Sequence, residues 1–347
     1  MPHRGAPAAP VTVRAFAPGR VNLIGDHVDY VGGLVLPMAV QLGTTVEFGA
    51  GGDILEMRST SRPEVASISL PIPDPATVEP EWARFIAGAA VEIGLATGGH
   101  GVVSTTLPIG SGMSSSAALT VAAALAFGAT FEDPVAGAHL VRRAEALASG
   151  FESGLMDQLA ILGAEEGTAC LLDCRDESIV RLRLPEGLAV HAVHCGVERR
   201  LAGSEYAARR RSCEEAEVRI GPLRDAGLDD VDRIGDPDLR RRARHVVTEI
   251  ERVRNAAEAL ESGDVEALGE AMIASHRSLR DDYDVSIPEL DELQQRLCAI
   301  DGVHGARLTG AGFGGCVVAV ADDDVPDHVI GGWRLRPGGP ARLISSL

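Results

Sequence analysis

Residues 16–33 read FAPGRVNLIGDHVDYVGG, a stretch that is mostly apolar and rich in glycine. Apolar runs exclude charged groups unless those groups are paired or bound to something polar. Within ten positions, this run nevertheless holds four ionisable side chains, Arg20, Asp26, His27 and Asp29. The stretch therefore predicts a polar site that holds a ligand.

The rest of the chain is long enough for two domains, because its 347 residues are 45% hydrophobic and can bury a large core. Short β-rich runs separated by Gly and Pro extend to about residue 106, and charged amphipathic helices follow after about residue 200. We place the boundary near residue 185, which gives domains 1–185 and 186–347.

The spacing of apolar residues predicts the individual elements. Strands are expected over 11–17, 33–40, 43–50, 65–70, 100–108, 167–174, 178–184, 188–195 and 316–321. Helices are expected over 81–96, 113–128, 134–148, 204–220, 239–263, 265–283 and 288–300.

The charge pattern excludes several classes of function. The formal net charge is −18, which argues against a nucleic-acid partner because that partner needs a basic surface. The chain contains no lysine, so a Walker A loop, a protein-kinase fold and Schiff-base chemistry are excluded. A nucleotide would have to be held by backbone, hydroxyl groups, arginine and a metal ion.

The cysteines and apolar runs indicate where the protein is found. The six cysteines form neither a CxxC pair nor a Cys/His cluster, so we expect reduced thiols rather than disulfides or zinc sites. No leader or membrane-spanning run is recognised in the sequence. We therefore expect a cytoplasmic protein without a membrane partner.

Residues 107–126, LPIGSGMSSSAALTVAAALA, favour an anion site. Gly110 and Gly112 allow backbone N–H groups to approach an anion closely. Ser114, Ser115 and Ser116 add hydroxyl groups where the Ala-rich helix offers free N–H donors and a positive dipole end. A structural N-cap is the alternative, but one serine is enough for a cap.

A second glycine-rich segment, GAGFGG at 310–315, fits the pattern GxGxxG. A dinucleotide-binding motif of this type opens a helix, whereas here the strand-like run CVVAVA follows. Two interpretations stay open: a hairpin turn, or a loop that lines the nucleotide cleft from the second domain.

Four separated segments together resemble the GHMP small-molecule kinase family and, within it, the galactokinases. The segments are PGRVNLIGDHVDYVGGLVLPMA at 18–39, LPIGSGMSSSAA at 107–118, GLMDQLAILGAEEGTACLLDCR at 154–175 and RLTGAGFGGCVVAV at 307–320. The resemblance implies a two-domain α+β fold with the active site in the cleft between the domains. The N-terminal domain would resemble domain 2 of ribosomal protein S5, and the C-terminal domain would be ferredoxin-like.

The resemblance also implies the reaction: the γ-phosphoryl group of MgATP would pass to the C1 hydroxyl of galactose. Asp157 would accept the proton of that hydroxyl, and Arg20 would keep the carboxylate ionised and offset charge during transfer. Contacts to the sugar would come from Arg20, Asp26, His27, Asp29, Gly154, Asp157 and Tyr206. The triphosphate would lie along Gly110, Gly112, Ser114, Ser115 and Ser116.

Magnesium ligands are implied at Ser116 and Glu145, since this ion prefers oxygen donors. An ion pair between Glu145 and Arg142 is the structural alternative. The expected partners are therefore galactose or a related sugar and ATP, with the protein acting as a monomer or a weak dimer.

One position departs from the galactokinase pattern, because Asp26 stands where these enzymes usually carry Glu. The shorter acid leaves open another sugar 1-kinase, acting on arabinose, galacturonate or N-acetylgalactosamine. A non-catalytic galactose- and ATP-binding regulator is a further alternative, although the presence of both Asp157 and Arg20 argues against it.

Overall fold

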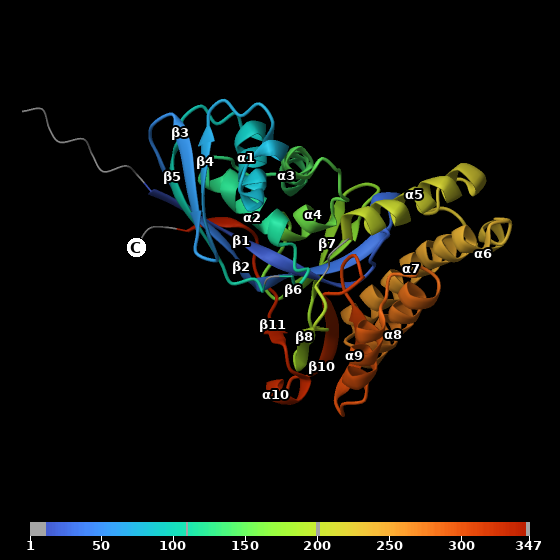
Figure 1. Ribbon diagram of the computed structural model, residues 1–347. Helices are drawn as coiled ribbons and strands as arrows, with labels where there is room; N and C mark the ends of the chain where they lie inside the picture. Colours follow the sequence, from blue (N-terminus) through green and yellow to red (C-terminus); the bar gives the residue numbers. More distant parts are fainter. Residues whose placement is uncertain (1–11, 109, 199–201, 345–347) are drawn as a thin grey trace, which may run out of the picture.

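The computed structural model describes residues 12–108, 110–198 and 202–344 (Figure 1). These residues form an eight-stranded sheet and a four-stranded sheet together with helices, which confirms the predicted α+β class. No helix in the described part of the chain is long and apolar enough to cross a bilayer.

The larger sheet has the strand order β12-β1-β2-β5-β3-β4, with β6 paired to β2 and β7 to β6. Its pairs are antiparallel except for the parallel pair β3–β5. The strands are β1 (Thr12–Ile24), β2 (Leu34–Ala50), β3 (Ile54–Ser59), β4 (Arg62–Ser69), β5 (Gly99–Thr105), β6 (Thr168–Asp173), β7 (Ser178–Arg183) and β12 (Arg342–Ile344).

Four helices lie together against this sheet (Figure 1). They are α1 (Arg84–Glu92), α2 (Ser115–Ala126), α3 (Pro134–Ser149) and α4 (Met156–Leu162). In α2, every residue from Ala117 to Ala126 is buried. A helix that is apolar on all sides belongs in the interior, and its many alanines let the sheet and the other helices approach it closely. This packing fixes the N-terminus of α2, where the serines lie.

The smaller sheet is antiparallel, in the order β11-β8-β10-β9. Its strands are β8 (Leu188–His194), β9 (Val303–Leu308), β10 (Cys316–Asp322) and β11 (Trp333–Leu335). Amphipathic helices lie beside it, with α8 and α9 in contact with β9 (Figure 1). The helices of this part are α5 (Ala202–Ile220), α6 (Leu228–Val231), α7 (Pro237–Ser262), α8 (Val265–Asp281), α9 (Pro288–Cys298) and α10 (Asp327–Ile330).

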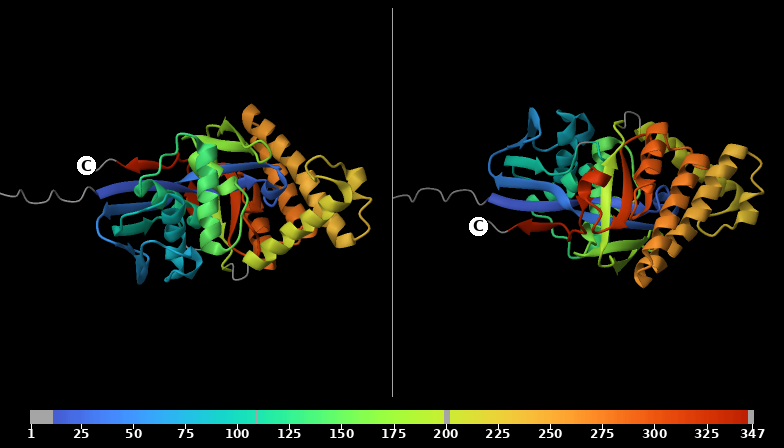
Figure 2. Two further views of the ribbon diagram at one scale, coloured as in Figure 1. Left: turned by 90° about the horizontal axis from the view of Figure 1, so that it is seen from above. Right: turned by 90° about the horizontal axis from the view of Figure 1, so that it is seen from below.

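Several elements, among them β3, β9 and α4, were not expected from the sequence, and two further differences concern the larger sheet. The strands predicted over 33–40 and 43–50 form one long strand, β2, which pairs with β6 at one end and with β5 at the other. The strand β12 lies in the larger sheet beside β1 (Figure 2), although it comes from the segment assigned to the second domain. The boundary at residue 185 falls between β7 and β8 and stays a prediction.

A fully buried arginine connects the two sheets. Arg307 of β9 has 0% exposed surface, and its Nη1 donates to the carbonyl oxygens of Asn22 and Leu23 of β1, both at 3.3 Å. Its Nη2 forms an ion pair with Asp26 at 2.6 Å, and its Nε donates to Ser275 Oγ at 3.1 Å. A buried charge is tolerated when it is paired and hydrogen-bonded in this way.

Replacement of this arginine should therefore be costly. In Arg307→Met, the carboxylate of Asp26 stays buried without its cation, so we expect the free energy of unfolding to fall by about 3–5 kcal/mol. Urea unfolding followed by circular dichroism measures this loss. The control is Arg334→Met, whose exposed partners Asp323 and Asp327 should limit the loss to about 1 kcal/mol. Equal losses in both variants would contradict the assigned role of Arg307.

Candidate active site

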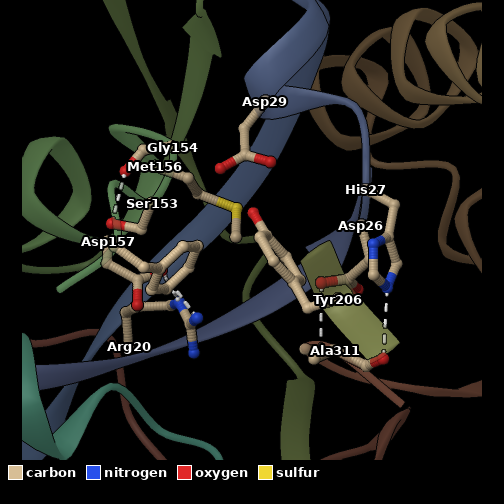
Figure 3. Close-up of a pocket in the computed structure, with 12 residues that line it drawn as sticks. Arg20, Asp26, His27, Asp29, Ser153, Gly154, Met156, Asp157, Tyr206 and Ala311 are labelled. Atoms are coloured by element: carbon tan, nitrogen blue, oxygen red, sulfur yellow. Dashed lines mark hydrogen bonds and ion pairs between the residues drawn. The ribbon is translucent and has the colours of Figure 1, made fainter. Parts of the chain in front are cut away.

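A cavity of about 240 Å³ lies where loops from both sheets meet (Figure 3). Its walls come from β1 and the loop after it, the start of α4, the helix α5, and the loop between β9 and β10. All seven residues expected to contact a sugar line it: Arg20, Asp26, His27, Asp29, Gly154, Asp157 and Tyr206.

Arg20 and Asp157 form an ion pair at one side of this cavity. Arg20 Nε donates to Asp157 Oδ1 at 2.8 Å, and Nη2 lies 2.6 Å from the same oxygen. Nη1 donates to the carbonyl oxygen of Gly112 at 2.6 Å, so the guanidinium also holds the glycine loop. The arginine side chain is 7% exposed and the aspartate 27%, which leaves the carboxylate open to a ligand.

Ser114 makes a contact that the sequence did not predict. Its hydroxyl donates to Asp157 Oδ2, whereas we expected it to face a phosphate. Ser114 has a φ of 55°, a left-handed conformation that is uncommon outside glycine. The strained backbone turns the hydroxyl toward the carboxylate, so Ser114 positions Asp157. The prediction that it also lines the triphosphate stays a prediction.

Asp29 and Gly154 are in direct contact. A Cβ atom built on Gly154 would lie 1.7 Å from Asp29 Oδ2, so only glycine allows this approach. Burial, together with the negative charges of Asp157 and Asp26, raises the pKa of Asp29 to about 7. Asp29 is therefore partly protonated near neutral pH and gains from a ligand that donates hydrogen bonds.

Asp26 and His27 are already bonded to protein groups. Asp26 Oδ1 accepts from the backbone N–H of Gly310 at 3.0 Å, and Oδ2 pairs with Arg307. His27 Nε2 lies 3.2 Å from the carbonyl oxygen of Ala311. Both side chains thus help to build the wall of the cavity. Direct hydrogen bonds from them to a sugar hydroxyl stay a prediction.

Tyr206 crosses the cavity from α5 (Figure 3). Its ring centroid lies 5.5 Å from that of His27, 5.4 Å from that of Tyr30 and 5.8 Å from that of Phe151. Burial raises the pKa of its hydroxyl well above the usual value, so the group stays a neutral donor. The ring can thus cover one face of a small ligand.

The glycine-rich segment 310–315 forms the hairpin loop between β9 and β10, as one of the two interpretations expected. Gly310 and Ala311 line the cavity at Arg20 and Asp157. The loop therefore serves the cavity of the sugar residues.

A second cavity, of about 200 Å³, begins at the N-terminus of α2. Gly110, Ser115 and Ser116 line one part of it, while Trp82 and Phe85 line another. The arrangement offers hydroxyl and backbone groups for phosphates and aromatic faces for a base. The sequence analysis missed both aromatic residues, because scattered apolar side chains look like ordinary core.

Glu145 of α3 lies close to both cavities. Its carboxylate accepts a hydrogen bond from Gln158 Nε2, and the hydroxyl of Ser116 lies near enough to influence its pKa. The ion pair with Arg142 that is the structural alternative is not seen among the described residues, and the Nε of Arg142 is buried without a hydrogen-bond partner. Burial and the charge of Asp157 raise the pKa of Glu145 to about 7, which shows that the site lacks a full counter-charge.

The donor set fits magnesium. The described residues contain no group of three or more His, Cys, Asp or Glu side chains able to hold a metal. Magnesium, however, uses one or two carboxylates and takes its other ligands from phosphates and water. Glu145 and the Ser116 hydroxyl supply such oxygen donors beside the phosphate loop.

Comparisons with known proteins agree with this geometry. The galactokinase galactose-binding signature matches residues 5–50, the GHMP kinase N-terminal domain 84–164 and the GHMP kinase C-terminal domain 256–336. Human galactokinase is 40% identical over 95% of this chain and 89% of its own length. Bovine galactokinase is 41% identical over 90% of this chain and 85% of its own length.

Solved structures show the same fold. Lactococcus lactis galactokinase, solved with galactose, superposes with a TM-score of 0.87 and 30% identity, over 95% of each chain. The Methanococcus jannaschii mevalonate kinase has a TM-score of 0.71 at 18% identity, over 96% of this chain and 100% of its own. The expected two-domain α+β architecture is thereby confirmed.

The raised pKa of Asp29 gives a pH-dependent stability. The folded state binds the proton up to about pH 7, whereas the unfolded state releases it near 3.8, so this group lowers stability as pH rises between these values. In Asp29→Asn the penalty is absent. We expect its free energy of unfolding, relative to the wild type, to increase from pH 4 to pH 7 and then stay level.

Urea unfolding at a series of pH values measures this difference. Asp176→Asn is the control, because hydrogen bonds from Ser178 lower the pKa of this exposed carboxyl. That variant should show no gain with rising pH. A flat difference for Asp29→Asn would show that its pKa is not raised.

Proposed function

The chain belongs to the galactokinase family of GHMP kinases, and we propose that it transfers the γ-phosphoryl group of MgATP to the C1 hydroxyl of α-D-galactose. The products are galactose 1-phosphate and ADP. The observation that carries the proposal is the ion pair of Arg20 with Asp157, at 2.6 Å, in the wall of a cavity formed by both sheets.

The roles follow from this geometry. Asp157 accepts the proton of the C1 hydroxyl, for which its oxygens keep lone pairs beyond those used by Arg20 and Ser114. The guanidinium of Arg20 offsets negative charge as the phosphoryl group moves. Phosphoryl transfer depends mainly on such positioning and charge stabilisation. Ser114 bonds Asp157 and is followed directly by Ser115 and Ser116, which line the second cavity, so it connects the proposed sugar site with the proposed ATP site.

The cavity suits a single monosaccharide. Its volume of about 240 Å³ lies below the roughly 300–1,000 Å³ typical of drug-sized ligands. Asp29 and Gly154 offer acceptor and backbone groups on one wall, and Tyr206 covers the ring. Each hydroxyl that leaves water needs such a partner.

ATP occupies the second cavity in this proposal. Its base packs against Trp82 and Phe85, and its phosphates lie along Gly110, Ser115 and Ser116. Glu145 and Ser116 would hold magnesium, and the ion would offset the negative charge of the phosphates. The cytoplasmic location and the monomeric or weakly dimeric state stay predictions.

A second candidate is another sugar 1-kinase of the same family, for arabinose, galacturonate or N-acetylgalactosamine. It is favoured by Asp26, which lines the cavity but has both carboxylate oxygens in contact with protein groups, Arg307 and Gly310. A comparison of kcat/KM across these sugars and galactose, with the product position checked by NMR, separates the two. Absence of sugar-dependent ADP formation with all of them would instead indicate a non-catalytic binder.

Asp157→Asn and Arg20→Ala should lose turnover while staying folded. Removal of a proton acceptor or of the stabilising charge costs on the order of 10² to 10⁴ in rate. A coupled ADP-release assay with galactose measures kcat, and circular dichroism reports the fold. Asp281→Asn and Arg280→Ala are matched controls, since these residues form an exposed ion pair. Near-normal turnover in either site variant would contradict its role.

Glu145 should make magnesium binding depend on pH. Because the metal competes with a proton that leaves near pH 7, the apparent affinity should rise roughly tenfold from pH 6 to pH 8. A magnesium titration in the presence of ADP, followed by thermal shift, measures this without catalysis. In Glu145→Gln, binding should weaken, and only the pH dependence of the nucleotide phosphates should remain. Glu177→Gln, on the surface pair with His139, is the control. Unchanged binding in Glu145→Gln would contradict the magnesium site.

A further inference from the structure

The three tyrosines of the chain all lie around one histidine at the wall of the sugar cavity. The ring centroid of His27 lies 6.1 Å from that of Tyr30, 5.5 Å from that of Tyr206 and 4.8 Å from that of Tyr283. These tyrosines come from three separate parts of the chain. Such a concentration of a rare residue type indicates a common task.

Hydrogen bonds join two of these tyrosines into a row that leads away from the cavity. Tyr30 Oη lies 3.2 Å from His27 Nδ1 and 2.5 Å from Tyr283 Oη. Tyr283 Oη in turn lies 3.2 Å from the Sγ of Cys213 in α5. Tyr283 and Cys213 are buried, so the inner end of the row is shielded from water.

For a neutral His27 ring, one carbonyl group sets the direction of every hydrogen bond in the row. The carbonyl oxygen of Ala311 can only accept, so His27 Nε2 carries the proton in that contact at 3.2 Å. In a neutral ring, Nδ1 is then the acceptor and Tyr30 donates to it. Tyr30 accepts from Tyr283, and Tyr283 accepts from the thiol of Cys213.

The donors keep their protons throughout the physiological range. Burial raises the pKa of both Tyr30 and Tyr283 well above the usual value and that of Cys213 to about 12. Each group therefore has one proton to donate and cannot reverse its role by ionising.

The row ends on one strained residue at the cavity wall. His27 has a φ of 65°, which is uncommon for a residue other than glycine. Its Nε2 holds Ala311, and the neighbouring Gly310 holds Asp26. The orientation of one imidazole ring thus fixes the hairpin loop 310–315 against the loop that follows β1.

We propose that Tyr30, Tyr283 and Cys213 are positioning residues that hold His27 as a neutral ring with its proton on Nε2, and so keep the sugar cavity in its binding shape. The inference rests on the proposed function, because it concerns affinity for the sugar. None of the three positioning residues lines the cavity, so they act on the sugar only through His27.

The position in the row sets the size of the expected effect. Tyr30→Phe removes the group bonded to His27 and should raise KM for galactose about tenfold, with kcat within about twofold. Tyr283→Phe leaves Tyr30 able to donate and should raise KM about threefold, and Cys213→Ala less than about twofold. If the three residues only stabilised the fold, KM would follow the loss of stability instead. Tyr283→Phe would then have the largest effect, because Tyr283 is the most buried of the three.

The KM values of these variants are therefore compared with their melting temperatures. Cys213→Ser keeps a donor and should restore the wild-type KM. Cys170→Ala, which removes an equally buried thiol far from the row, should leave KM unchanged. A KM that follows loss of stability, or an unchanged KM in Tyr30→Phe, overturns the proposal.

The protonation state of His27 is a direct test that needs no catalysis. Long-range ¹H–¹⁵N spectra of the wild type, with His27→Gln to assign the ring, should show an unprotonated Nδ1 and a protonated Nε2. A proton on Nδ1 overturns the proposal even if the protein phosphorylates galactose. Inactivity with galactose, together with the expected spectrum, would reject the proposed function and leave the assigned tautomer intact.

Discussion

The active site depends on one buried cation. Arg307 has 0% exposed surface and reaches from β9 to the carbonyl oxygens of Asn22 and Leu23 and to the carboxylate of Asp26. Such a charge is stable in the interior only when carboxylate and carbonyl groups surround it. Because Asp26 also accepts from Gly310, the same network sets the distance between the loops that carry the sugar cavity.

Carboxyl groups outnumber their cationic partners around the cavity. Asp29 and Glu145 both feel the charge of Asp157, and Arg20 is the cation paired with Asp157. Arg20 pairs with Asp157, and the other two carboxyls have their pKa raised to about 7 by burial and by the charge of Asp157. Perturbed carboxyls gather where ligands complete the electrostatics. A metal ion at Glu145 would supply the missing positive charge, and sugar hydroxyls at Asp29 would supply the missing hydrogen-bond donors.

Local sequence patterns were sufficient to predict part of the fold and of the candidate site. The alanine-rich periodicity predicted α2, and the glycines and serines before it predicted a phosphate loop at its N-terminus, because both signals lie within a few residues. The pairing of Asp26 with Gly310 spans 284 positions and has no local signature. Trp82 and Phe85, which line the second cavity, were not predicted, because an apolar side chain that lines a cavity has the same sequence pattern as one in the core. The contact of Ser114 with Asp157 depends on a backbone angle that the sequence does not reveal.

Backbone strain marks the places where these long-range contacts meet. Among the described residues, five other than glycine have positive φ, and His27 and Ser114 are two of them. Glycine would adopt either angle without strain, but it would remove the imidazole that holds Ala311 and the hydroxyl that holds Asp157. A strained residue persists when its surroundings over-determine it. At both positions the side chain therefore offsets the backbone strain, since it orients a wall of the cavity in one case and the carboxylate of Asp157, the proposed proton acceptor, in the other.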